Sequence, residues 1–384
     1  MTRASTYHAA HAVATTIATH FAQHLAEARA RGESGLADPP SSYAIEKMID
    51  ATFWASFRPE EGRFPKISLA FVPAQQARQP LTFAQRLPLN TATLTKLAPA
   101  VERPGIHLGV WRERDGDDEE LFIWGATRKV PSLGFVLEDI EPGLLVIKHR
   151  RAAGFGKFAN VAVLKGEQVK IVDEQGQSLP DCPDLLKSLH AFTAREQSQP
   201  HINGLVQLAA SMRAHGQGGT LLVVPDSSEQ WRESIVHPIV YSVVPPFNRL
   251  ANLITQGAKR EAENEWEAAL RNAVDVVAGL TAVDGATVIS SAYDVLAFGA
   301  KIKRAVGHEA VEQMMLTEPI VGNQAEVAHP VLHGGTRHLS AAQFIYDQRD
   351  ALGLVASQDG RFTVFAWSPC EQMVHAHRVD VLLM

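Results

Sequence analysis

The sequence predicts an N-terminal α+β domain followed by a C-terminal α/β domain in which helices flank a central sheet. In the first half, short apolar strands separated by turn residues fill about residues 64–173. In the second half, helical and strand-like periods alternate. A length of 384 residues is typical of two or three domains. Polar stretches between the halves place the expected boundary between residues 195 and 196, giving domains 1–195 and 196–384.

The first domain is expected to open with a helix, because apolar residues from Val13 to Ala28 recur at spacings of three or four. The helix ends in the Gly-, Ser- and Pro-rich stretch 32–40. Alternating or continuous apolar runs then predict the strands of this domain, at 67–71, 106–110, 121–124, 144–147, 161–164 and 169–172.

The second domain is expected to begin with a helix at about 202–212, which stops at a Gly-rich turn before a buried strand at 220–224. A further helix follows Pro246, and a long charged helix has its apolar face on Trp266 to Val277. Three more apolar runs predict strands of the same sheet, at 286–289, 352–356 and 362–365.

Composition excludes several classes of function. There are 42 acidic and 36 basic side chains, so a broad basic surface for nucleic acid or anionic membrane is not expected. No apolar run approaches the roughly 18 residues of a membrane helix, and the N-terminus has no signal-peptide core. Two cysteines are too few for a disulfide framework and fit a reducing compartment. We expect a soluble, cytoplasmic protein that is not bound to a membrane.

Five short motifs follow one another in the second half of the sequence. They are the strand Gly219–Val224, the Asp284-Gly285-Ala286 strand start, the turn Gly334–His338, the helix start Ser340–Ala342 and the turn Ala356–Gly360. In this order they resemble the motifs of DisA-type diadenylate cyclase domains. Each motif alone is common, whereas their joint order is much more specific. The resemblance spans about residues 200–384 and implies a mixed central sheet flanked by helices.

This resemblance implies a metal-dependent nucleotidyltransferase that joins two ATP molecules into cyclic di-AMP and releases two pyrophosphates. Mg²⁺ or Mn²⁺ would bind hard carboxylate oxygens, with Asp284 and Asp359 as the metal ligands. Arg337 would grip the triphosphate through its forked donors. The resemblance assigns catalysis to Asp284, Arg337 and His338, and nucleotide binding to Gly285, Ala286, Gly335, Thr336, Arg337, His338 and Ser357.

The sequence departs from the family pattern at three places. Leu339 stands where the family turn has its second arginine, Gln358-Asp359 replaces a Glu-Glu pair, and Val283 precedes the catalytic aspartate. These changes keep two alternatives open: a nucleotide-binding sensor that has lost turnover, and a partner-binding scaffold. As purely structural features, Asp284-Gly285 would be a strand-leading turn and Thr336 a helix cap.

Two apolar segments of the first half, Ile106 to Trp111 and Leu121 to Gly125, also resemble a known family. They are similar to segments of the sensor domain called DACNV, which is found ahead of such cyclases. No catalytic set accompanies it, and its ligand is unknown. Trp111 and Trp124 could line a ligand pocket, although aromatic residues on strands are more often core.

Partner expectations follow from the reaction. Because closing a cyclic dinucleotide requires two reciprocal attacks, two sites must face each other, so we expect a homo-oligomer with face-to-face cyclase domains. Two histidine groups, His20 with His24 and Cys370 with His375 and His377, could in principle hold a metal but lack a complete ligand set.

Overall fold

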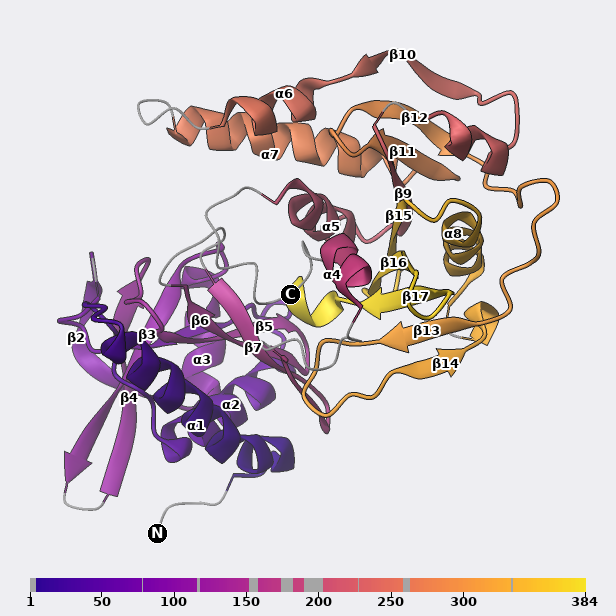
Figure 1. Cartoon of the computed structure of the whole chain (residues 1–384). Coiled ribbons are helices and arrows are strands. Elements are labelled where there is room, and N and C mark those ends of the chain that lie inside the picture. The colour runs from indigo at the N-terminus through magenta and orange to yellow at the C-terminus, as the bar shows by residue number, and fades with distance from the viewer. Residues whose placement is uncertain are drawn as a thin grey trace. The chain divides into compact units, whose positions relative to one another are not determined.

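The computed structural model describes residues 5–77, 79–115, 118–151, 158–173, 182–189, 203–226, 228–257, 263–332 and 334–384. The chain forms two compact units, Met1–Val172 with Met384, and Asp173–Leu383 (Figure 1). The boundary expected between residues 195 and 196 lies outside the described residues.

The first unit is built on an eight-stranded mixed sheet with the strand order β2-β4-β3-β1-β5-β6-β7-β8. Only β1 and β3 pair in parallel among these described strands. The strands are β1 (Ser68–Phe71), β2 (Leu81–Pro88), β3 (His107–Asp115), β4 (Asp118–Thr127), β5 (Phe135–Glu141), β6 (Leu144–Arg150), β7 (Phe158–Lys165) and β8 (Gln168–Ile171). The helices are α1 (His8–Ala30), α2 (Ser42–Ser56), α3 (Thr91–Leu97) and the 3-10 turn η1 (Ala98–Ala100).

Two of these helices bury one face of the sheet. The apolar stripe of α1 packs with α2 and with inward-facing residues of β1, β3, β5 and β6 in one core, so the first helix is confirmed. We did not predict α2 from the sequence. It begins at Ser41, whose hydroxyl accepts a hydrogen bond from the Ala44 amide at 3.0 Å and so satisfies one of the free donors of the first turn.

Trp124 belongs to the core of this unit. Its indole N–H donates to the Val72 carbonyl at 2.7 Å, and only 4% of the residue is exposed. Its ring lies where a side chain at Gly109 would be, 2.1 Å from the position of a Cβ there. Trp111 packs against Phe71, with ring centroids 4.7 Å apart. Both tryptophans therefore contribute to packing, the more common of the two readings of their sequence.

The second unit contains a nine-stranded mixed sheet with the order β10-β12-β11-β9-β15-β16-β17-β13-β14. The strands are β9 (Gly219–Val224), β10 (Tyr241–Phe247), β11 (Ala286–Ser290), β12 (Val295–Ala300), β13 (Met314–Thr317), β14 (Glu326–Ala328), β15 (Leu352–Ala356), β16 (Phe362–Ser368) and β17 (Met373–Arg378). The helices are α4 (Pro183–Leu189), α5 (Gly204–Ala214), α6 (Arg249–Gln256), α7 (Glu263–Leu280) and α8 (Thr336–Asp347), with 3-10 turns at η4 (Gln230–Ser234), η5 (Pro330–Leu332) and η6 (Asp380–Leu382).

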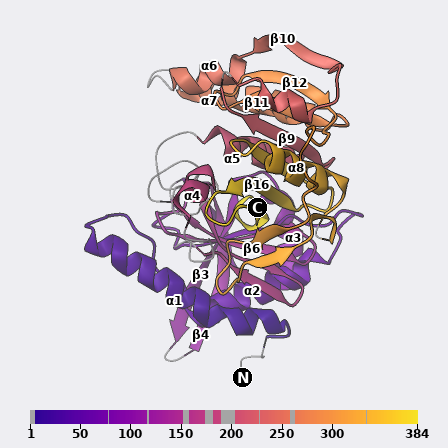
Figure 2. The same cartoon turned by 45° about the vertical axis from the view of Figure 1, so that its right-hand side comes forward.

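Helices cover both faces of this second sheet. Residues of α4, α5 and α7 form one core with the sheet, and α8 forms another with its opposite face. The four predicted strands are confirmed as β9, β11, β15 and β16, and β9 and β16 are buried along their whole length. Burial on both faces explains their continuous apolar runs. α6 lies beside α7 in both views (Figures 1 and 2), and the Trp266 indole donates to the Leu253 carbonyl at 3.1 Å. The expected α/β class is therefore confirmed for this unit.

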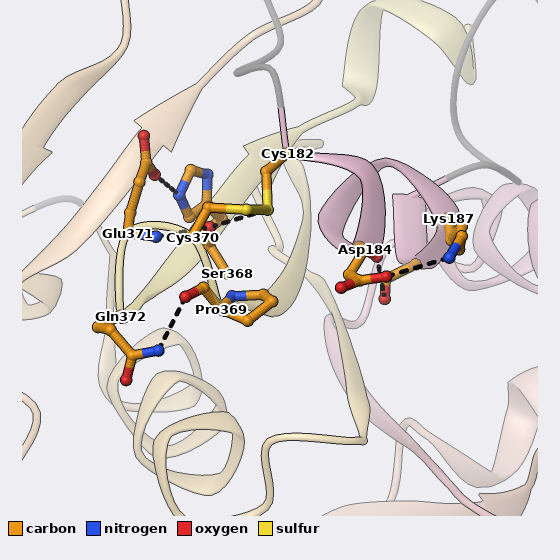
Figure 3. The surroundings of a disulfide bond; sticks show 10 residues. Cys182, Asp184, Lys187, Ser368, Pro369, Cys370, Glu371 and Gln372 are labelled. Carbon is orange, nitrogen blue, oxygen red and sulfur yellow. Dashed lines mark hydrogen bonds and ion pairs between the residues drawn. A yellow bond between two sulfur atoms is a disulfide. The ribbon is translucent and has the colours of Figure 1, made fainter.

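Cys182 and Cys370 form a disulfide, with Cα atoms 6.0 Å apart (Figure 3). Cys182 directly precedes α4, and Cys370 lies in the turn between β16 and β17, so the bond attaches α4 to the sheet. The sequence had not indicated this pairing. Because disulfides persist mainly in oxidising compartments, the cysteine count no longer supports a reducing one. In the described part of the chain, no helix is long and apolar enough to cross a membrane.

Candidate functional site

One end of the second sheet gathers the ends of four strands. β9 and β11 are parallel, with Thr220 paired to Ala286, so both begin at this end. β15 is antiparallel to β9 and ends here, with Ala356 paired to Gly219. β12 is antiparallel to β11 and also ends here, with Ala300 paired to Ala286. The loops that precede β9 and β11 and follow β12 and β15 are therefore neighbours.

Several of the predicted site residues lie in these loops or beside them. Asp284 and Gly285 directly precede β11, and Ser357 directly follows β15. Arg337, in the first turn of α8, places its Nη1 atom 2.9 Å from the position that a Cβ at Gly218 would occupy. Gly218 has a φ of +72° and directly precedes β9, so a glycine is needed there for both backbone and space. The fold thus brings Asp284 to the same end of the sheet as Ser357, which follows it by 73 positions (357 − 284) in the sequence.

Asp284 forms an ion pair with Lys301 at this end of the sheet. Its side chain is 94% exposed, and its Oδ2 lies 2.5 Å from the Lys301 Nζ at the end of β12. The hydrogen bond and charge of Lys301, and then the charge of Arg337, lower the pKa of Asp284 below its usual value. Asp284 is therefore an ionised, solvent-facing carboxylate with two basic side chains near it.

Gly285 allows the backbone of β11 to pass very close to that of β12. Its φ is +121°, and a Cβ there would lie 2.5 Å from the carbonyl carbon of Gly299. Gly299 has a φ of +60°, and a Cβ there would lie 2.8 Å from the Tyr241 ring. The sequence resemblance assigns Gly285 and Ala286 to nucleotide binding. In the structure, the close approach at Gly285 is to the neighbouring strand, while Ala286 is buried.

The turn Gly334–His338 starts α8. Gly335 is the N-cap residue and Thr336 is already the first helical residue, so the reading of Thr336 as the helix cap is wrong. The carbonyl of Gly335 accepts from the amides of His338 and Leu339, at 3.0 and 3.3 Å. The amides of the first helical residues point out of the helix end, which is a favourable arrangement for an anion. Gly335, Thr336 and Arg337 are exposed there.

His338 lies beneath this turn and not on its surface. It is 5% exposed, its Nε2 is 3.3 Å from the Thr363 hydroxyl, and its ring meets the edge of Phe365. A Cβ at Gly334 would lie 2.2 Å from its Cγ, so the glycine makes room for the ring. Burial, and then the charge of Arg378, lowers the pKa of His338 to about 4. His338 is therefore a neutral, packed side chain at neutral pH.

Ser357 and Asp359 belong to the tight turn between β15 and β16. The Ser357 amide donates to the Arg361 carbonyl at 2.9 Å, and the Gly360 amide donates back to the Ser357 carbonyl at 3.2 Å. The Asp359 Oδ2 lies 3.3 Å from the Arg361 Nε, and both side chains are more than half exposed. Asp359 also acts on the pKa of His338, which it raises. The turn thus belongs to the same end of the sheet as Asp284 and Arg337.

The residues expected to hold a metal fit that role in part. Asp284 offers exposed hard oxygen, but each proposed carboxylate ligand is already paired with a cation, Asp284 with Lys301 and Asp359 with Arg361. Among the described residues, no group of three or more His, Cys, Asp and Glu side chains could hold a metal ion. Mg²⁺ commonly takes only one or two carboxylates and completes its shell with water and substrate phosphates. The residues therefore suit a cation that arrives with a phosphate ligand.

The sequence did not indicate two features of this site, the Lys301 side chain and the Tyr241–Phe298 aromatic pair. Lys301 follows the strand that returns after Asp284, and only the β11–β12 pairing shows that it reaches the carboxylate. Tyr241 and Phe298, on the paired strands β10 and β12, stack with centroids 4.8 Å apart and an interplanar angle of 3°. Tyr241 is 47% exposed and lies beside Gly299, so it offers an aromatic surface near Asp284.

Two surface hollows lie among the described residues of the first unit. One, of about 660 Å³, lies between the loop after α2 and the segment of α3 and η1, and includes the exposed Phe64 with Arg63 and Lys66. The other, of about 390 Å³, lies beside Arg150 and Gln76. Both are within the usual size range of small-molecule sites. Either hollow is large enough to accept a small molecule.

The histidine groups noted in the sequence have structural surroundings. The rings of His20 and His24 are stacked at 4.2 Å, and His24 lies 5.9 Å from the His149 ring. His375 bonds Glu371, and the Nδ1 of His377 lies 2.7 Å from the Thr317 hydroxyl. Cys370 is bonded to Cys182. None of these belongs to a cluster of three metal-binding side chains within the described ranges.

Comparison with known proteins supports the sensor part of the chain. Residues 34–128 match the family model described as probable sensor domain DACNV. The match covers α2 and β1 to β4, and includes both hydrophobic segments that carried the resemblance. No diadenylate cyclase domain is detected in the chain. No curated protein matches the sequence. The first unit therefore contains a segment that matches a sensor domain, and this match does not extend to the second unit.

Proposed function

We propose that the chain is a diadenylate cyclase in which the second unit joins two ATP molecules into cyclic di-AMP under the control of the N-terminal sensor. The convergence of Asp284, Gly285 and Arg337 at one end of the second sheet carries this proposal. These residues come from motifs that match the cyclase pattern in order, and a scaffold would need no such convergence. DACNV domains are often N-terminal to diadenylate cyclases, so the match of residues 34–128 also favours a cyclase in the second unit.

The reaction requires positioning and charge more than covalent help. The 3′ oxygen of one ATP attacks the α-phosphorus of the other, the bond to the β-phosphate oxygen breaks, and pyrophosphate leaves while the hydroxyl proton passes to solvent. The second, reciprocal attack closes the ring. Arg337 and the exposed amides of Thr336 and Arg337 would hold the phosphates in line. The exposed ring of Tyr241 would accept an adenine by stacking. His338 would position this turn from below.

Asp284 would hold Mg²⁺ or Mn²⁺, with Asp359 proposed as the second carboxylate. When bound, the divalent cation would neutralise the charge that develops on the leaving pyrophosphate. The role of the protein would be to orient the exposed Asp284 carboxylate toward the phosphates and to keep Arg337 beside it. Ser357, Gly335 and Ala286 complete the proposed nucleotide site through their places around the same loops.

The same reaction requires two copies of the chain. The strand β10 and the residue before it offer exposed apolar side chains beside the site, with Val240 at 77%, Val244 at 87% and Tyr241 at 47% exposure. We propose that such surfaces let two second units face each other, each bringing its own Asp284 and Arg337. Sedimentation velocity under assay conditions should find dimers or larger oligomers, and an active monomer would contradict this arrangement.

Three observations favour a second candidate, a nucleotide sensor without turnover. Lys301 forms an ion pair with Asp284. Leu339 packs against the core at the position where the family has an arginine. Gln358 stands where the family has an acidic residue. Such a protein would bind ATP through Arg337 but would lack the charge balance needed for catalysis.

Incubation with ATP separates the two candidates. The purified full chain is incubated with ATP and either Mg²⁺ or Mn²⁺, and the nucleotides are separated by chromatography while pyrophosphate is measured by a coupled assay. A cyclase yields two pyrophosphates for each cyclic di-AMP. ATP binding with no pyrophosphate under either metal would establish the sensor reading, and the absence of ATP binding would exclude both.

Replacing Arg337 tests the phosphate contact. Arg337→Ala should weaken the binding of α,β-methylene-ATP about tenfold or more, because charge-assisted hydrogen bonds to phosphate contribute roughly 1.5–3 kcal/mol. Isothermal titration calorimetry measures the change. Arg304→Ala is the matched control, since Arg304 is an exposed arginine beyond the end of β12. Equal affinities of the Arg337→Ala protein and the wild type would remove Arg337 from the site.

A further inference from the structure

Lys301 forms an ion pair with Asp284, the carboxylate that the proposed function assigns to the metal. Its Nζ lies 2.5 Å from the Asp284 Oδ2, and the two side chains are 54% and 94% exposed. Lys301 follows β12, directly beside the start of β11, because Ala300 pairs with Ala286. The ion pair is therefore set by the pairing of two strands and not by neighbouring positions in the sequence.

The charges around Asp284 disfavour a free divalent cation. Arg337 also acts electrostatically on Asp284, so two basic side chains surround one carboxylate. A divalent cation approaching this group meets a locally positive site. A bound nucleoside triphosphate makes the local charge negative, because it brings several negative charges to the same loops. Its phosphates are better partners for an ammonium group than a single exposed carboxylate.

The Lys301 ammonium can change partners easily. Exposed ion pairs contribute little to stability, so breaking this one costs little. The lysine stem is flexible and its three donors rotate freely, which allows the ammonium to follow a phosphate group. Asp284 is then released with both oxygens open to solvent.

We propose that Lys301 keeps divalent cations off Asp284 in the nucleotide-free protein and moves to the phosphates when a nucleotide binds, so that the cation enters together with the nucleotide. This inference rests on the proposed function, because it assigns the metal and the triphosphate to the same end of the sheet. It makes Lys301 a residue that controls the order of binding at that site.

Binding of Mn²⁺ to the full chain without nucleotide tests the inference. Free Mn²⁺ is measured by electron paramagnetic resonance during a titration of the wild type, Lys301→Met and Lys303→Met. Lys303 is the matched control, as an exposed lysine two positions further along. Lys301→Met should bind Mn²⁺ at least about tenfold more tightly than the other two proteins, because one positive charge beside the carboxylate is gone. The double variant Lys301→Met, Asp284→Asn should lose that gain.

A second titration adds α,β-methylene-ATP, which binds without reacting. After subtraction of the Mn²⁺ that the same concentration of α,β-methylene-ATP binds without protein, the Mn²⁺ affinity of the wild type should be at least about tenfold higher than in the absence of nucleotide. Equal Mn²⁺ affinities of the wild type and Lys301→Met without nucleotide would overturn the inference, and so would a gain that survives in the double variant. Neither titration depends on turnover. A protein that forms no cyclic product would therefore contradict the proposed function alone, and the role of Lys301 would still be decided.

Discussion

Asp284→Asn should abolish the formation of cyclic di-AMP, with a loss of about a hundredfold or more in turnover. The substitution keeps the size of the side chain and removes the charge that would hold the divalent cation. Binding of the triphosphate itself should persist, because Arg337 and the first amides of α8 remain. Product is followed by chromatography at saturating ATP and Mn²⁺.

The fold should not be affected by this change. The Asp284 side chain is 94% exposed and its partner Lys301 is also exposed, so loss of their ion pair should leave the unfolding transition almost unchanged. Asp350→Asn is the control, because Asp350 is an exposed aspartate beyond the end of α8. Turnover at the wild-type rate by the Asp284→Asn protein would show that the catalytic carboxylate lies elsewhere.

The central part of this site could be predicted because its residues directly adjoin buried strands. The runs 220–224, 286–289 and 352–356 are continuously apolar, so their ends mark where the chain leaves the sheet. Asp284 stands two residues before the second run, and Ser357 one residue after the third. Parallel or antiparallel pairing with β9 then brings these ends together.

The remainder depends on pairing between distant positions. Lys301 meets Asp284 only because Gly285 and Gly299 let β11 and β12 approach closely, which no local pattern reveals. Cys182 and Cys370 are 188 residues apart, so their bond could not be inferred from spacing. By contrast, α2 could have been predicted from the sequence, although we did not predict it. Its buried residues Ile45, Met48, Ile49 and Phe53 recur at helical spacing.

The second large effect concerns acid stability. His338 and His377 are buried and neutral. Burial, and then the charge of Arg378, lowers the pKa of His338 to about 4. Burial, and then the charge of His375, lowers the pKa of His377 to about 3. The ordinary value of a histidine is about 6.5. Both residues therefore remain unprotonated in the folded protein at pH values where the unfolded chain binds protons.

The sign of the effect follows from this difference. Well above pH 6.5 neither the folded nor the unfolded chain binds a proton at His338 or His377, so these residues do not reduce the free energy of unfolding. As the pH falls below about 6.5 the unfolded chain gains protons first, so the free energy of unfolding decreases until the folded pKa values are reached. For two such histidines the slope approaches about 2.7 kcal/mol per pH unit. Between about pH 6.5 and 5 the loss is roughly 3 kcal/mol, because the full slope is reached only toward the lower end of this range; this is a large part of the 5–15 kcal/mol typical of a protein.

Urea unfolding followed by circular dichroism at pH 7.5, 6.5, 5.5 and 5.0 measures this loss. Because glutamine cannot be protonated, His377→Gln should reduce the slope with pH, by about 1.4 kcal/mol per pH unit at most. The slope is the relevant quantity, since the variant also changes the contact of His377 with Thr317 and so the stability at every pH. His329→Gln, at an exposed position, should leave the slope unchanged. If the His377→Gln protein keeps the slope of the wild type, His377 is not among the groups that cause the acid sensitivity.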